Sequence, residues 1–206
     1  MASSDARKVS ELLDDLANRP GPRVSLAEIV AVLGDRAFGV LMLMLALPNA
    51  VGIGGIPGVS TVFGVPQIFV AGQMMAGLRR PWLPRWLLAK SIARADFRRV
   101  VERARPRLTS FERRLRPRMA WLVSARAERL LGIVYLLQAF IVSMPIPHGN
   151  QPPAIAMALI AIGVIERDGR CVLIGLLAST LATAIAFAVV SLGAAAVWYA
   201  VTHVFG

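Results

Sequence analysis

The amino-acid sequence predicts an all-α, polytopic helical membrane protein, and three observations lead to this fold class. Hydrophobic residues fill 56% of the 206 positions, more than soluble domains of this size usually contain. The excess is concentrated in blocks, and the last block, Cys171 to Phe205, contains no Asp, Glu, Lys or Arg. About 20 consecutive apolar residues are enough to cross a bilayer. Two earlier blocks are each interrupted by proline and glycine, which predicts two broken helical hairpins, either re-entrant or fully crossing.

Residues 1–34 are predicted to form an amphipathic N-terminal region. Apolar residues recur at helical spacing over Val9–Ala17 with acids on the other face, and Arg19–Pro22 should end this short helix. Ser25 and Glu28 have the spacing of a capping box, so a second helix is expected to begin there. The acids in this region leave no apolar signal-peptide core, so no cleavable signal is expected.

Residues 35–78 are expected to form the first broken hairpin. It opens with Asp35-Arg36, continues through an apolar limb over Ala37–Leu47, and reaches a glycine-rich break that begins at Pro48 and ends at Pro57-Gly58. A limb of this length measures about 16 Å, half of a hydrocarbon core of about 30 Å. Pro48 should end the first limb, because proline lacks an N–H. Ser60 and Thr61 should cap the second limb, in which Gln67 and Gln73 are polar exceptions.

Residues 79–127 form a basic segment. Between Arg79 and Arg129 the chain carries 16 Lys and Arg residues against four acids. Apolar residues are interleaved with these charges. The pattern predicts amphipathic helices on the cytoplasmic face of a membrane, with a bilayer of anionic headgroups as the partner. The alternative is a helical hairpin packed on itself. Nucleic acid is not expected as a partner, because apolar blocks flank the basic segment on both sides.

Residues 128–166 are expected to form the second broken hairpin. Glu128-Arg129 precedes an apolar limb from Leu130 to Met144, and a second limb runs from Ala154 to Ile165. The break between the limbs contains Pro145, Pro147 and Gly149. The charged turn after the hairpin contains Glu166, Arg167 and Asp168. Residues 171–205 are expected to form one long membrane helix or two short helices hinged near Ser191.

The two hairpins also share a sequence motif. Asp35-Arg36-x-x-Gly39 matches Glu128-Arg129-x-x-Gly132, and an apolar limb, a break and a second limb follow in both cases. The limb lengths differ, so an internal repeat is a hypothesis. It matters because internal repeats build the central site of many transporters.

Polar residues beside the breaks and at the limb ends are the candidate pathway. An ionisable residue inside a membrane is a functional hypothesis, whereas at the interface it is an anchor. Amide side chains and free helix ends at the breaks could bind an ion, and the alternative is an ordinary turn in water. The candidate pathway residues are Asp35, Arg36, Asn49, Ser60, Thr61, Gln73, Glu128, Arg129, Gln138 and Asn150. The helix breaks are Pro48, Pro57, Gly58, Pro145, Pro147 and Gly149.

No enzyme chemistry is expected. The chain has 12 acids, no D-x-D pattern for a metal-bound sugar nucleotide and no G-x-x-x-x-G-K-[ST] phosphate loop. His148 and His203 are too few and too far apart for a metal site. No metal and no cofactor are expected, and the single Cys171 excludes an intramolecular disulfide.

Two stretches of the sequence carry a family resemblance. One combines Gly34-Asp35-Arg36 with Ile56–Thr61 and Pro81–Pro84, and the other combines Glu128-Arg129-Leu130-x-Gly132 with Pro145–Asn150 and Glu166–Gly169. Together they resemble the ExoD family of bacterial inner-membrane proteins over residues 8–200. The resemblance implies a role in exopolysaccharide production or export and in tolerance of alkaline conditions. His148 stands where the family is expected to have an apolar or aromatic residue, so the resemblance gives His148 no role.

Two functions are therefore weighed for a multi-pass protein of the bacterial inner membrane with a cytoplasmic basic segment. The first is a small transporter or channel-like protein for an ion, a proton or an anionic envelope precursor. It would work as a homo-oligomer, because so few spans rarely enclose a pathway alone. The second is a non-transporting scaffold that organises polysaccharide machinery.

Overall fold

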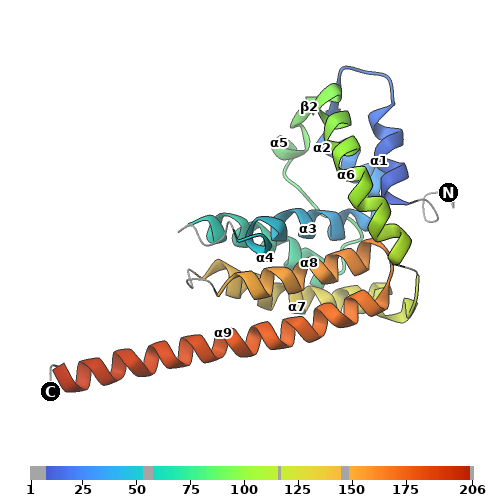
Figure 1. Ribbon diagram of the computed structural model, residues 1–206. Coiled ribbons are helices and arrows are strands. Elements are labelled where there is room, and N and C mark those ends of the chain that lie inside the picture. Colours follow the sequence, from blue (N-terminus) through green and yellow to red (C-terminus); the bar gives the residue numbers. More distant parts are fainter. Residues whose placement is uncertain (1–7, 53–57, 116, 145–148, 205–206) are drawn as a thin grey trace.

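The computed structural model describes residues 8–52, 58–115, 117–144 and 149–204, and most of them are helical (Figure 1). A head, made of the first two helices and the basic helix, lies beside α3 (Ala37–Ala50) toward one end of a four-helix bundle, and a long C-terminal helix lies along the opposite side of that bundle. In chain order the elements are α1 Val9–Ala17, β1 Arg23–Ser25, α2 Leu26–Leu33, η1 Gly34–Arg36, α3 Ala37–Ala50, α4 Val59–Met75, α5 Arg85–Leu88, β2 Ser91–Ala93, α6 Arg94–Arg114, η3 Ala120–Val123, α7 Ala125–Ser143, α8 Gln151–Ile165 and α9 Gly169–Val204.

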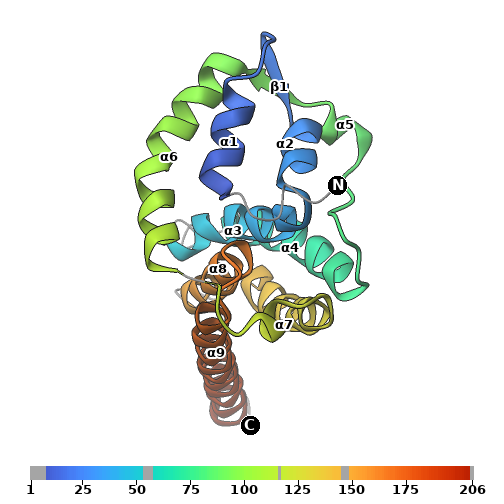
Figure 2. The same cartoon turned by 90° about the vertical axis from the view of Figure 1, so that its right-hand side faces the viewer.

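The head is held together by α1, α2 and α6, with a small β-ladder beside them (Figure 2). The capping box of Ser25 and Glu28 is present, as the sequence predicted. The fold is mostly helical rather than strictly all-α, because β1 pairs antiparallel with β2. Arg94 is 9% exposed and donates hydrogen bonds to the backbone carbonyls of Leu16, Gly21 and Arg23. Charge-assisted bonds of this kind are among the stronger ones in proteins.

The apolar face of α6 packs on protein. Phe97 and Val101 are 6% and 3% exposed, and they lie in one cluster with Leu16 and Val24. For these two side chains the expected contact with lipid is therefore wrong. Their partners lie on α1 and β1, so the alternative of a basic segment packed on itself does not describe them either. Helical periodicity identifies an apolar face without identifying what covers it.

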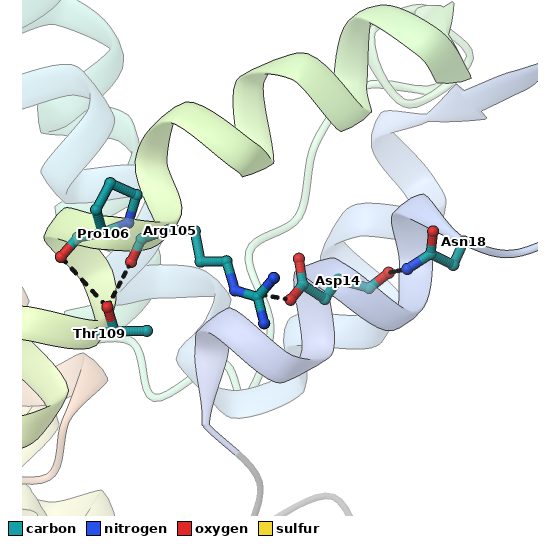
Figure 3. Close-up of polar contacts among 5 residues, drawn as sticks. All are labelled: Asp14, Asn18, Arg105, Pro106 and Thr109. Atoms are coloured by element: carbon teal, nitrogen blue, oxygen red, sulfur yellow. Dashed lines mark hydrogen bonds and ion pairs between the residues drawn. The ribbon is translucent and has the colours of Figure 1, made fainter.

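A polar contact further along α6 also joins this helix to α1. Arg105 Nε lies 3.3 Å from Asp14 Oδ2 on α1, and Asn18 Nδ2 donates to the Asp14 carbonyl over 3.0 Å (Figure 3). One turn further along α6, Thr109 Oγ1 donates to the carbonyl of Arg105. The basic helix is thus tied to α1 by charge as well as by its apolar face.

The bundle consists of two helical hairpins, α3–α4 and α7–α8. The helix α3 packs on α8, and α4 packs on α7. Gly39 near the start of α3 lies against Ala161 and Ile165 near the end of α8, so these two helices are antiparallel. Gly132 on α7 lies against Met74 and Met75 at the end of α4 in the same way. In each case a Cβ would come within 3.2 Å of a backbone atom of the partner helix. The two glycines of the shared sequence motif therefore each allow a close helix contact between the hairpins, as does Gly64 of α4 against Ser143 of α7.

The two hairpins bury side chains in the same order. Along the first limbs, Phe38, Met42 and Ala46 of α3 are buried, as are Leu131, Tyr135 and Ala139 of α7. Along the second limbs, Val70, Ala71 and Met74 of α4 are buried, as are Ile160, Ala161 and Val164 of α8. All twelve belong to one hydrophobic core. Both second limbs end alike, since the N–H groups of Ala76 and Glu166 bond to the carbonyls four residues back, and Gly77 and Arg167 follow with positive φ.

The helix α9 settles an alternative that the sequence left open. It is one continuous helix of 36 residues without a hinge at Ser191. It packs on α8 through Gly175 and Val172, and Ala186 is the last buried residue among the side chains described on this helix. Figure 1 shows its C-terminal part extending past the ends of both hairpins. The large apolar side chains that are exposed there are Phe187, Val189, Val190, Leu192, Trp198, Tyr199 and Val201.

Three expected limb boundaries are wrong. The helix α3 does not end at Pro48 but continues to Ala50, because a proline this near the end breaks little of the remaining helix. The N-cap of α4 is Gly58, with φ of 88°, so neither Ser60 nor Thr61 caps it. The helix α8 starts at Gln151, with proline in its first turn, where the missing N–H costs nothing. The predicted break residues Pro57, Pro145 and Pro147, and also His148, lie outside the described residues.

Candidate functional site

The charged residues of the two motifs meet at the head end of the bundle. Glu128 lies in the first turn of α7, before the apolar part of that helix. Burial and then the Asp35 carboxylate raise the pKa of Glu128, while Arg167 lowers it. The first acid–arginine pair, the second pair and the charged turn are therefore close in space. Asp35 and Arg129 are exposed, and Arg36 and Glu128 are half-buried, so this end is accessible to water.

Two residues of this charged end have mainly structural contacts. The absence of a Cβ at Gly77 leaves room for the Arg129 guanidinium, which lies against that glycine. Asp168 is 5% exposed, and its Oδ1 accepts the N–H of Arg170 over 2.9 Å at the start of α9. Asp168 also pairs with Arg118 in an isolated β-bridge. The charged turn thus anchors α9 to the end of the basic segment.

At the opposite end, the helix breaks of the two hairpins are tied to each other. Thr61 Oγ1 at the start of α4 donates to the carbonyl of Ser143 at the end of α7 over 3.2 Å. Gln151 Nε2 at the start of α8 donates to the carbonyl of Ala50 at the end of α3 over 3.2 Å. Each second limb therefore caps the first limb of the other hairpin. Thr61 therefore bonds to the end of α7 and does not cap its own helix, α4.

Among the described residues, four buried amide side chains have unpaired atoms: Asn49, Gln67, Asn150, and Gln138, whose Oε1 is unpaired. Asn49 is 1% exposed and Gln67 is fully buried, and neither the nitrogen nor the oxygen of either side chain has a hydrogen-bond partner among the described residues. Asn150 is 4% exposed and uses its Nδ2 to donate to the Met144 carbonyl over 3.0 Å, while its Oδ1 is unpaired. A buried polar atom without a partner costs about 1–3 kcal/mol. Such groups therefore point to a site that binds water or a polar solute.

The corresponding positions of the two hairpins explain why these amides are exceptional. Asn49 on α3 stands where α7 has Val142, and Gln67 on α4 stands where α8 has Met157; both counterparts are fully buried. The same environment is thus filled by apolar side chains in one hairpin and by amides in the other. Packing alone does not require the amides. Gln67 was not among the predicted pathway residues, although its polarity within an apolar limb was the available signal.

Four other predicted residues lie elsewhere in the bundle or have partners of their own. Gln73 pairs with the backbone of Trp82, donating from Nε2 to its carbonyl over 3.0 Å and accepting its N–H. Gln138 joins α7 to α9, since its Nε2 donates to the Ser179 carbonyl over 2.9 Å and to Thr183 Oγ1 over 3.0 Å. Ser60 is 3% exposed and near the start of α4. Gly149 is buried beside Asn150.

The lengths of the helices matter for the depth of this site. The helix α3 has 14 residues, which measure about 21 Å and fall short of a hydrocarbon core of about 30 Å. In the part of the chain that the structure describes, two helical stretches are long and apolar enough to cross a membrane, Leu26–Ala50 and Gly169–Ala195, and the first reaches that length only when α2 and η1 are counted with α3. The second begins beside the charged turn, and Trp198 and Tyr199 follow its end, as aromatic residues do at interfaces.

Comparison with known proteins identifies the family of this chain. A family model described as "Exopolysaccharide synthesis, ExoD" matches residues 9–188. The chain belongs to the ExoD family. It is 31% identical over 204 residues to "Protein ExoD" of Rhizobium meliloti (strain 1021), covering 97% of this chain and 84% of that protein. It is 34% identical over 162 residues to "Uncharacterized protein slr1875" of Synechocystis sp., covering 78% of this chain and 76% of the relative. No solved structure matches this ExoD-family chain.

Family membership and the two long apolar helices together indicate that this ExoD-family protein is associated with a membrane. The description of the family model links the ExoD family to exopolysaccharide synthesis.

Proposed function

We propose that this ExoD-family protein is a small transporter or channel-like protein of the bacterial inner membrane. Its two hairpins enter the membrane from the head side, and their breaks hold a polar site within the bilayer. The observation that supports this most directly is the group of buried, unpaired amides, Asn49, Gln67 and Asn150, at the break end of the bundle. In this proposal the cargo is an ion, a proton or an anionic envelope precursor, and no enzyme chemistry is involved.

The depth of the breaks follows from comparing helix lengths. The apolar part of α9 runs from Cys171 to Trp198, about 40 Å of helix, which matches the full thickness of a bilayer with its headgroups. Measured from the same charged end, α3 extends only about 21 Å. The breaks therefore stop inside the hydrocarbon region. Irregular backbone is tolerated there only where protein or a water-filled cavity surrounds it.

We also propose that the hairpins are an internal repeat. The matching Gly39 and Gly132 contacts, the matching burial order and the reciprocal bonds from Thr61 and Gln151 support this. Both breaks lie at the same end of the bundle. The symmetry axis therefore runs along the helices, as in parallel transporter repeats, which places any shared site between the hairpins.

The orientation and assembly complete the proposal. The head carries the basic α6, so the positive-inside rule places the head and the acid–arginine pairs in the cytoplasm. The exposed apolar side chains of α9 beyond Ala186 need lipid or protein around them, which supports a homo-oligomer whose α9 helices surround the space beyond the breaks.

A depth measurement tests the re-entrant arrangement. In a Cys171→Ala background, single cysteines replace Val51 at the end of α3, Thr202 near the end of α9, and Arg103 on α6. Each carries a nitroxide label in phospholipid vesicles, and collisions with oxygen and with a water-soluble nickel chelate report its depth. The Val51 label is expected in the hydrocarbon and the other two in water or headgroups. Equal nickel access at Val51 and Thr202 would show that the hairpins cross fully.

A flux measurement tests transport itself. The purified protein is reconstituted in vesicles that contain a pH-sensitive or a chloride-sensitive dye, and a potassium diffusion potential drives the ion. The variants Asn49→Val and Gln67→Met carry the side chain found at the corresponding position of the other hairpin. They are expected to lower flux at least tenfold, whereas the control Leu47→Met, at an exposed limb position, leaves it unchanged. Wild-type vesicles that leak no faster than empty ones for either ion would contradict a role in proton or chloride transport.

A scaffold remains the second candidate, because α6 presents exposed arginines away from the bundle. Arg99 and Arg103 are exposed, and Arg99 pairs with the exposed Asp96 of the same helix, whereas Arg94 and Arg98 bond to the backbone of the head and Arg105 pairs with Asp14. A scaffold test must therefore neutralise Arg99 and Arg103 only. If exopolysaccharide output falls in that variant and not in Gln67→Met, the result would support the scaffold function and contradict the transporter function.

A further inference from the structure

A groove runs between α7 and α9 on the side of the molecule away from the head. It consists of two cavities of about 520 Å³ and 310 Å³. Val134 and Leu176 line both of them, so the cavities join end to end. The smaller one opens beside η3 and the start of α7, and the larger one continues along α9 as far as Phe187.

The groove exists because α9 presents small side chains to α7 along this stretch. Ser179, Thr183 and Ala184 line the larger cavity, and so does Gln138 of α7, which reaches across to Ser179 and Thr183. The walls are otherwise hydrocarbon, from residues such as Leu137 and Leu176. From Arg126 to Gln138 the axis of α7 rises about 18 Å, slightly more than half of a hydrocarbon core of about 30 Å. That is the length of one hydrocarbon chain within one leaflet.

The open end of the groove differs from the rest. Trp121, which is 65% exposed, and the exposed Arg126 line the smaller cavity at the charged end of the bundle. Tryptophan and arginine are characteristic of the headgroup level. Basic residues between membrane helices on the cytoplasmic side bind anionic headgroups. The groove thus combines a cationic mouth with an apolar channel of about one chain length.

These features favour a lipid over an apolar helix as the occupant. The apolar walls match a hydrocarbon chain, and Arg126 at the mouth matches an anionic headgroup, which an apolar helix would not supply. A single hydrocarbon chain is thin enough to enter. Neither a free phosphate nor a soluble anion would use the apolar part.

We propose that the α7–α9 groove is a binding site for one anionic membrane lipid, with a hydrocarbon chain between the helices and a phosphate headgroup at Arg126. The site does not depend on transport through the hairpins. It lies on the outer side of α7, whereas the buried amides lie between the hairpins.

The test uses the fluorescence of Trp121 in the full-length chain. Trp82, Trp86 and Trp198 are replaced by phenylalanine, and the protein is reconstituted in phosphatidylcholine vesicles with increasing fractions of brominated phosphatidylglycerol or brominated phosphatidylcholine. Bromine quenches a tryptophan that it contacts. Saturable quenching at least fivefold more sensitive to phosphatidylglycerol is expected. Added inorganic phosphate is expected to have no effect.

Two pairs of variants make the result specific. Thr180→Phe fills the larger cavity, whereas Leu177→Phe places the same aromatic ring one turn away, at a position that does not line the groove. Arg126→Gln removes the cation at the mouth, whereas Arg103→Gln removes one from the head. Thr180→Phe should abolish saturable quenching, and Arg126→Gln should remove the preference for phosphatidylglycerol, with both controls unchanged. Equal quenching by the two lipids that Thr180→Phe does not alter would overturn the proposal and leave only non-specific boundary lipid.

Discussion

Replacing Gly132 by alanine should weaken the contact between the two hairpins, and Gly72 provides a matched control. A Cβ at Gly132 would lie 2.5 Å from the nitrogen and 2.8 Å from the Cα of Met75, so a backbone has to move. At Gly72, which lies on α4, a Cβ would meet nothing within 4 Å. The two substitutions add the same methyl group to adjoining helices, and only one of them creates a clash.

The expected magnitudes follow from these distances. Overpacking costs about 1–3 kcal/mol, and the upper half of that range applies because the atoms in contact are backbone. Alanine returns up to about 1 kcal/mol through its higher helix propensity. Gly132→Ala should therefore lose about 1–2 kcal/mol, and Gly72→Ala should gain about 0.5–1 kcal/mol. Gly39→Ala should fall between them, since the nearest atom there, Ile165 Cγ1 at 2.8 Å, belongs to a side chain that can rotate.

Thermal unfolding in detergent, followed by tryptophan fluorescence, measures these differences. For a chain of this size about 1 kcal/mol corresponds to about 2–4 °C. Gly132→Ala should thus unfold about 2–8 °C below the wild type, and Gly72→Ala about 1–4 °C above it. If Gly132→Ala matched or exceeded the wild type, or if Gly72→Ala fell as far as Gly132→Ala, the close crossing of α4 and α7 would be wrong.

Three further predictions concern single side chains. Folding raises the pKa of Glu128 from 4.5, so stability should decline as the pH rises from that value through the pKa of the folded state. Glu128→Gln should flatten this part of a plot of unfolding temperature against pH, and parallel curves for the variant and the wild type would contradict the prediction. Arg94→Ala should cost about 3 kcal/mol, because three carbonyls lose a charged donor, and hydrogen exchange should speed up over residues 16–24; the exposed Arg103→Ala should change stability by less than about 0.5 kcal/mol. Gln67→Met should raise stability by about 1–2 kcal/mol by removing two unpaired buried atoms, and a drop in unfolding temperature would imply that Gln67 has a partner.

The elements with local chemical causes could be predicted from the sequence. The capping box at Ser25, the short helix before it and the two broken apolar segments follow from residue spacing alone. The matching motifs at Asp35 and Glu128 also drew attention to residues that come close in the fold. These are features that neighbouring residues determine.

The features that depend on distant partners could not be predicted. Nothing around Gly39 indicates that Ala161 faces it, and nothing around Phe97 distinguishes a protein surface from a lipid surface. The effect of a proline depends on how much helix follows it, so Pro48 looked like an end and proved to lie two residues before one. Gln73 and Gln67 are equally polar in sequence, but only Gln73 meets the backbone of Trp82, which leaves Gln67 as the unpaired side chain.

The unequal lengths of the helices have a consequence for the surrounding lipid. In the proposed arrangement the bilayer would meet a hydrophobic surface of about 40 Å next to α9 and one of about 21–26 Å next to α3 and α4. Lipid adapts to such mismatch by thickening or stretching on the long side and by thinning on the short side, at a cost of fractions of a kcal/mol per ångström. A protein arranged in this way would deform its membrane asymmetrically. In a membrane of uneven thickness it would collect where the bilayer is already thin on one side, before any partner or cargo is involved.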